Sequence, residues 1–123
     1  MYTRVKEHPR YFMELKEDKS VMFCCVNGTY TEADGLSSIN AFNEVVETLN
    51  PATTTLIIDC NGLQAQPQQL AALLLGCFKM YKETGFKEVH LVGSSSMTQL
   101  SQMKRLAKEA ELEVKFIKSF ERN

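Results

Sequence analysis

Two short apolar runs constrain the fold more than any other feature of this sequence. Residues 21–26 (VMFCCV) and 53–60 (TTTLIIDC) are too short for buried helices, and the second contains the continuous stretch Leu56-Ile57-Ile58. Strands that are apolar on both faces occur in the interior of sheets that are covered by helices. The sequence therefore predicts an α/β domain in which both runs are central strands.

Segments with helical periodicity follow these strands. Apolar residues recur every three or four positions, which is typical of amphipathic helices. The expected helices are residues 31–49, 70–81 and 97–110, and further strands are expected at residues 11–17, 88–92 and 112–116. The Thr31 hydroxyl is expected to cap the first helix, and Pro67 to occupy the first position of the second.

The expected element order is β-β-α-β-α-β-α-β. Strand–helix–strand crossovers join parallel neighbours, whereas the short turn between the first two strands makes an antiparallel hairpin. We therefore expect a mixed, mostly parallel sheet with helices packed on it. Residues 1–9 are polar and are interpreted as a leader, residues 10–118 as the domain, and residues 119–123 as a tail.

Charge and hydropathy narrow the possible functions. Fourteen basic and fifteen acidic side chains give a net charge of −1, so no overall field attracts nucleic acid or an anionic membrane. The longest apolar run, residues 70–75, is too short to span a membrane, and the first residues lack the apolar core of a signal peptide. These features predict a soluble cytoplasmic protein.

The sequence gives little sign of an active site. All four cysteines lie in apolar runs and are expected to be buried, reduced thiols: Cys24, Cys25, Cys60 and Cys77. They and the two histidines lack metal-ligand spacing. Residues 93–96 lack the glycine spacing and the lysine of phosphate-binding loops, so a hydroxyl-rich helix cap is favoured. We expect no enzyme activity, cofactor or metal.

Two single residues have both a functional and a structural interpretation. Asp59 ends a buried strand, where it is either a functional carboxylate or a partner for amides of the turn at Asn61 and Gly62. His90 lies in a strand without an evident nucleophile nearby, which favours a structural histidine.

Residues 64–69 (QAQPQQ) have the most unusual local composition. Four glutamines precede an apolar helix, and glutamine offers hydrogen-bond donors and acceptors without charge or nucleophilicity. That chemistry suits a contact surface, although a solvated loop explains it equally well. The helix that follows has more apolar residues than one buried stripe needs. This surplus is expected either if the helix is sandwiched between the sheet and a neighbouring helix or if it contacts a partner or a lipid-like ligand.

Three stretches resemble a STAS domain, the fold of bacterial anti-sigma-factor antagonists. Residues 11–28 resemble the opening hairpin of that family, and residues 54–63 (TTLIIDCNGL) resemble its strand and turn of the form LVLDLSGV. Residues 89–93 (VHLVG) resemble its LVLVG strand. The resemblance covers about residues 10–118 and implies a cytoplasmic, bacterial regulatory module that binds a protein partner, such as an anti-sigma factor or serine-kinase-like protein.

The sequence departs from this family at its regulatory motif. Antagonists of the family have a serine in a DSSG motif at the start of the second helix, and phosphorylation there adds charge to a packed interface. This chain has Gln66-Pro67-Gln68-Gln69 instead, and no serine or threonine occurs between Asn61 and Leu75. The resemblance therefore implies a binding module without the usual phosphoserine switch.

The leading hypothesis is a STAS-like interaction module without the phosphorylatable serine. Its expected partner-binding residues are Thr29, Tyr30, Gln64, Gln66, Pro67, Gln68 and Gln69. Neutral hydrogen bonds and packing of the Tyr30 ring would supply the contacts. The alternative is a module that binds a small ligand, either lipid-like or a nucleotide, against the apolar helix at residues 70–78.

Overall fold

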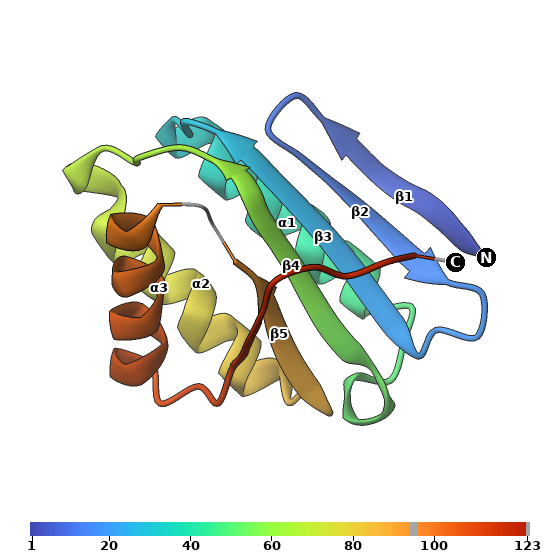
Figure 1. Cartoon of the computed structure of the whole chain (residues 1–123). Coiled ribbons are helices and arrows are strands. Elements are labelled where there is room, and N and C mark those ends of the chain that lie inside the picture. Colours follow the sequence, from blue (N-terminus) through green and yellow to red (C-terminus); the bar gives the residue numbers. More distant parts are fainter. Residues whose placement is uncertain (94–95, 123) are drawn as a thin grey trace.

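A six-stranded sheet lies at the centre of the computed structural model, which describes residues 1–93 and 96–122 (Figure 1). The strands are β1 (Tyr2–His8), β2 (Tyr11–Lys16), β3 (Val21–Gly28), β4 (Thr55–Leu63), β5 (Glu88–Val92) and β6 (Lys115–Ile117). The helices are α1 (Glu32–Val46), α2 (Ala71–Thr84) and α3 (Met97–Glu109), with 3-10 turns at Pro51–Thr53 and Gln68–Leu70.

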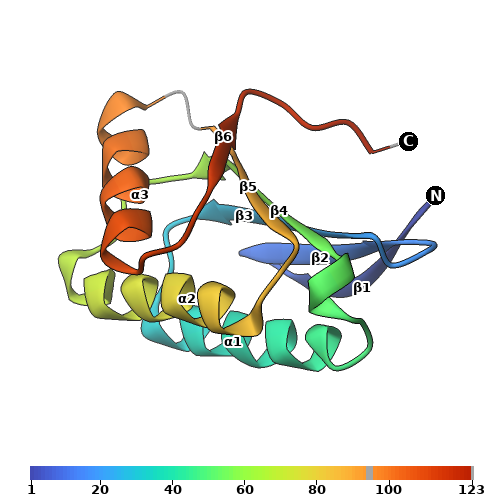
Figure 2. The same cartoon turned by 90° about the horizontal axis from the view of Figure 1, so that it is seen from below.

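The strands follow one another in chain order across the sheet, from β1 to β6. The first two pairings are antiparallel, and the pairings from β3 to β6 are parallel. Crossovers that all advance in one direction and share one handedness place their helices on one face. Figure 2 shows α1 and α2 beneath the same face of the sheet, with α3 at its flank. The expected mixed α/β architecture is confirmed.

The main core lies between the sheet and the helices. Met22 and Leu56 of the two central strands are 0% exposed, and they belong to one cluster with Phe42 of α1, Phe78 of α2 and Met103 of α3. The helix periodicity read from the sequence thus places apolar side chains of all three helices in one core. No helix in the described part of the chain is long and apolar enough to cross a membrane.

The N-terminal residues correct one expectation. Residues 2–8, for which no strand was expected, form β1, which pairs with β2 along the edge of the sheet. Most of their side chains are exposed, as suits an edge strand. β2 is consequently an interior strand, and the element order begins with three strands.

Boundaries differ at three further places. β4 continues to Leu63 instead of ending at Cys60, because its pairing with β3 resumes beyond a bulge. Pro67 precedes the 3-10 turn that leads into α2 and is not itself the first helical residue. The last strand covers only Lys115–Ile117.

The helix caps agree with the sequence where they are described. The Thr31 hydroxyl accepts a hydrogen bond from the Asp34 amide at 3.1 Å, and the Asp34 carboxylate accepts one from the Thr31 amide. The Ser96 hydroxyl likewise accepts from the Gln99 amide and caps α3. Residues 94 and 95 of the predicted hydroxyl-rich turn, and residue 123 of the predicted tail, lie outside the described residues.

Candidate binding site

Two loops meet at one end of the sheet, where the parallel strands β3 and β4 finish. β3 ends at Gly28 and β4 ends at Leu63, and these residues are register partners. The Gln64 amide donates a hydrogen bond to the Gly28 carbonyl at 3.1 Å. α/β folds commonly carry ligands at the carboxyl ends of their strands. The fold thus brings the two predicted groups of binding residues together at the carboxyl ends of β3 and β4.

Gly28 turns the chain out of β3 in the left-handed conformation, with a φ of 72°, which glycine adopts without a steric cost. Thr29 is exposed, and its hydroxyl donates to the Ala65 carbonyl at 3.4 Å. Tyr30 is half-buried, and its hydroxyl donates to the Arg10 carbonyl at 2.9 Å. Burial raises the pKa of Tyr30 well above its ordinary value of 10.0, so its hydroxyl stays a neutral donor.

Gln66 joins the two loops through its side-chain amide. Its Oε1 atom accepts from the Tyr30 backbone amide at 2.7 Å. Its Nε2 atom donates to the Gly28 carbonyl at 2.9 Å and to the Gln64 carbonyl at 2.6 Å. The polar atoms of Gln66 are therefore engaged within the protein, and its main effect is to fix the shape of the loops.

The other glutamines of the loop face solvent. Gln64, Gln68 and Gln69 are exposed, whereas Pro67 is half-buried. The Gln64 carbonyl also accepts from Nε2 of Gln99 in α3 at 3.2 Å, so the loop is tied to two elements. Thr29, Gln64, Gln68 and Gln69 together form an exposed uncharged surface, called the amide rim below.

An apolar cavity of about 80 Å³ lies behind these loops, between the sheet and α2. Its lining includes Tyr30 and Gln66 from the loops, Leu63 from β4, and Leu73, Leu74 and Cys77 from α2. The cavity itself was not predicted, because a sequence does not show which apolar side chains leave a space between them. The one feature of the sequence that pointed to it is that the second helix has more apolar residues than a single buried face needs.

The thiols near this cavity are poor nucleophiles. Cys60 is buried and Cys77 is half-buried, and both are free. Burial raises the pKa of Cys60 to about 12 and that of Cys77 to about 11, so both thiols are protonated near neutral pH. Only the thiolate form of cysteine is strongly nucleophilic.

The remaining sequence candidates have local structural roles. The Asp59 carboxylate accepts from the Asn61 amide at 2.9 Å, which confirms the turn interaction that was one of its two interpretations. His90 Nε2 lies 3.0 Å from the Glu88 carboxylate, which also pairs with Lys115 at 2.8 Å. Among residues 1–93 and 96–122, no three side chains of the metal-ligating types come together at a possible metal site.

The six-stranded mixed sheet and its three helices have a SpoIIAA-like fold, as the comparison with solved structures shows. One similar crystal structure is of an uncharacterized protein of the DUF3478 family with a SpoIIAA-like fold, from Shewanella loihica PV-4. The match has a TM-score of 0.65 and 14% identity, and it covers 97% of this chain and 89% of that chain.

A second similar structure is an anti-sigma factor antagonist from Mycobacterium paratuberculosis. It matches with a TM-score of 0.54 and 19% identity over 89% of this chain and 90% of that chain. At these identities the similarity establishes the fold alone. No protein-family model matches the sequence, and no curated protein matches it.

Proposed function

We propose that this chain is a STAS-like regulatory module that binds a protein partner through the amide rim. The observation that carries the proposal is the convergence of the two loops, which presents exposed, uncharged amides immediately before α2. One solved structure of similar fold is an anti-sigma factor antagonist. Members of the family that the sequence resembles have a modifiable serine in the region where this chain has residues 66–69. Here, neutral donors and acceptors replace it, so binding would be independent of phosphorylation there.

The role proposed for each residue follows from the contacts of its side chain. Gln64, Gln68, Gln69 and Thr29 would contact the partner, because their side chains are exposed. Gln66 would hold the two loops in the shape that the partner recognises, since its amide already bonds to three backbone groups. Pro67 would limit the flexibility of the loop, and Tyr30 would support it from below. The proposed setting is the cytoplasm of a bacterium, with no catalytic step.

The test compares exposed amides at two places on the molecule. A partner is isolated with the immobilised native chain, purified, and titrated into it by calorimetry. Replacing Gln64, Gln68 and Gln69 together by alanine is expected to weaken binding at least tenfold. The matched control replaces Asn40 and Asn43, two exposed amides of α1, and should leave affinity unchanged. Equal affinity of the triple variant and the native chain would refute the role of the amide rim.

The apolar cavity supports a second candidate function, the binding of a small apolar ligand. Its lining is almost entirely apolar, which does not suit a nucleotide. Pockets for drug-sized ligands occupy roughly 300–1,000 Å³, so at about 80 Å³ this cavity would need α2 to move outward before it could take a lipid-like chain. Native mass spectrometry tests this candidate: an apolar molecule retained on the protein supports it, and a bare 14.0 kDa species contradicts it.

A further inference from the structure

The second face of the sheet has a small apolar cluster of its own. Phe23, Ile57 and Val92 are each at most 2% exposed, although the helices lie on the opposite face. They are covered in part by the segment that follows β6, which crosses the sheet in Figure 1 toward the N-terminal strands. This segment, residues 118–122, has no regular secondary structure. It is called the strap below.

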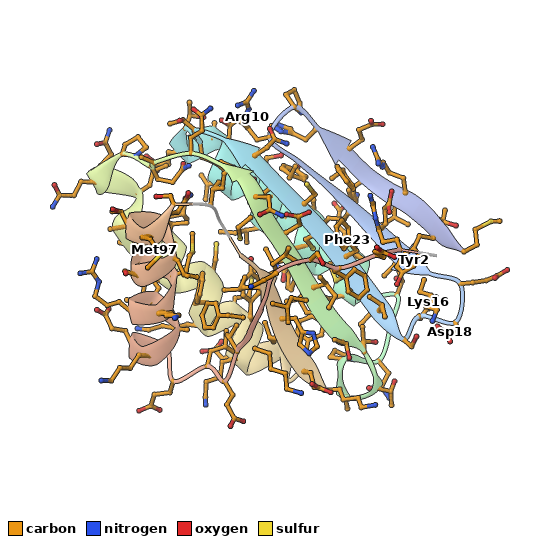
Figure 3. All side chains as sticks on the ribbon, viewed as in Figure 1. Tyr2, Arg10, Lys16, Asp18, Phe23 and Met97 are labelled. Carbon is orange, nitrogen blue, oxygen red and sulfur yellow. The ribbon has the colours of Figure 1, made fainter. Side chains whose placement is uncertain are left out.

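Two side chains of the strap, Phe120 and Arg122, contact aromatic and charged side chains of the sheet. The Phe120 ring stacks on Phe23, with 5.9 Å between the ring centroids and an angle of 21° between the planes. The Arg122 guanidinium lies 4.3 Å from the centroid of Phe23 and 5.5 Å from that of Phe12, and it forms an ion pair with Glu14. Figure 3 shows where Phe23 lies on this face, with Tyr2 nearby.

The side chains that receive Arg122 all come from β2 and β3, and Glu14 among them has a second cation partner outside the strap. Glu14 is only 12% exposed in its side chain, and its other oxygen already pairs with Arg4 at 3.0 Å. The Arg4 guanidinium also lies over the Phe12 ring at 3.8 Å. The carboxylate therefore has one cation from β1, and Arg122 is a second. Removing the strap would leave Glu14 paired with Arg4 and would take from the Phe23 ring its contacts with Phe120 and Arg122.

A carboxylate beside two aromatic rings is an arrangement that can bind a guanidinium group. A carboxylate fixes the guanidinium by charge-assisted hydrogen bonds, and aromatic faces attract it through their quadrupoles. We propose that Glu14, Phe12 and Phe23 form an arginine-binding site that Arg122 occupies within the chain, and that an arginine-containing segment of a protein partner takes this site when the strap is displaced. The favoured segment has an aromatic residue two positions before its arginine, as the strap has in Phe120 and Arg122.

The inference is independent of the amide rim. The rim lies at the carboxyl ends of β3 and β4, whereas this site lies on the helix-free face and is built by β2 and β3. The side chain of Arg122 is 34% exposed, so a competing segment can approach it. The strap would then act as a competitor that lowers the apparent affinity for any partner segment of the same chemistry.

The test uses the full chain with the strap weakened by Phe120→Ala and Arg122→Ala. The probe is a synthetic peptide with the sequence of residues 117–122 (IKSFER), titrated while backbone amide signals are followed by NMR. We expect the double variant to bind the peptide at least tenfold more tightly than the native chain, with shifts concentrated at residues 12, 14 and 23. Binding should weaken with salt, because an ion pair contributes to it.

A control peptide and an alternative variant complete the test. A peptide with alanine in place of its arginine should lose binding, and the single variant Arg122→Ala provides an alternative if the double variant folds poorly. Failure of both variants to bind the peptide, or equal binding of the alanine peptide, would overturn the proposal. A dimer of the native chain that the double variant loses would also overturn it, because the occupant would then be the strap of a second copy.

Discussion

At the scale of single residues, Gln66 differs from the other glutamines of the candidate site because its side chain holds the loops together and is half-buried, whereas theirs are exposed. Its amide spans the loops after β3 and β4 and bonds to the backbone of Tyr30, Gly28 and Gln64. The sequence marked all four glutamines of residues 64–69 as one group. They have the same chemistry, so only the loop geometry distinguishes the one that holds the backbone from those that face solvent.

Replacing Gln66 by alanine is expected to lower the free energy of unfolding by about 1–3 kcal/mol. The substitution leaves the half-buried amide of Tyr30 without its acceptor, and an unsatisfied polar group of this kind costs that much. Urea denaturation followed by circular dichroism measures the change. The matched control is Gln69→Ala, an exposed position where we expect a change within about 0.5 kcal/mol. If the two variants lose equal stability, Gln66 does not hold the loops together.

At the scale of elements, a glycine inside α2 and the glycine that follows it have opposite roles. Gly76 lies within the exposed surface of the helix, and a Cβ atom there would meet no atom within 4 Å. Gly85 ends the helix in the left-handed conformation, with a φ of 78°, and its amide donates to the Lys82 carbonyl. Alanine is favoured over glycine inside a helix but is strained at such a cap.

Gly76→Ala is therefore expected to raise the free energy of unfolding by about 0.5–1 kcal/mol. Gly85→Ala is expected to lower it by about 1 kcal/mol, because the cap needs a positive φ. Both variants add one methyl group, one inside α2 and one at its C-cap, so each controls for the other in a thermal or urea denaturation series. A shift of equal sign in both would contradict this account of α2.

The elements that were predicted correctly are those with a buried face. α1, α2, α3, β3 and β5 each carry an apolar pattern that burial against the core imposes. β1 was missed because edge pairing uses backbone hydrogen bonds and leaves most side chains exposed, so polarity alone did not reveal it. The end of β4 was misplaced for a related reason: Gly62 and Leu63 belong to the strand through pairing with β3 and not through an apolar alternation.

At the scale of the whole molecule, the order of elements along the chain predicted a mixed, mostly parallel sheet, and contacts between distant residues determine the features that were not predicted. The alternation of strands and helices was enough to predict a mixed sheet with helices packed on it. The strap could not be predicted, because the ion pair between Glu14 and Arg122 joins residues 108 positions apart. The convergence of the two loops was predicted, because parallel neighbours finish at the same edge.

Burial of ionisable groups in the main core predicts how the molecule loses stability in alkali. Burial raises the pKa of Cys24 and of Cys60 to about 12, from an ordinary value of 9.0, and also raises that of Tyr81. Between pH 9 and 12 the unfolded chain therefore releases thiol protons that the folded chain retains. The unfolded state then binds fewer protons, so the free energy of unfolding falls as the pH rises through this window.

Urea denaturation under reducing conditions between pH 7.5 and 10.5 checks this expectation. Stability should be little affected by these thiols up to about pH 8 and should then decline, with each of the two contributing about 1 kcal/mol of loss by pH 10. The double variant Cys24→Ala and Cys60→Ala should show a shallower decline. Cys25→Ala, the half-buried neighbour on the other face of β3, should change the slope much less. An identical decline in the native chain and the double variant would show that the buried thiols do not govern alkaline unfolding.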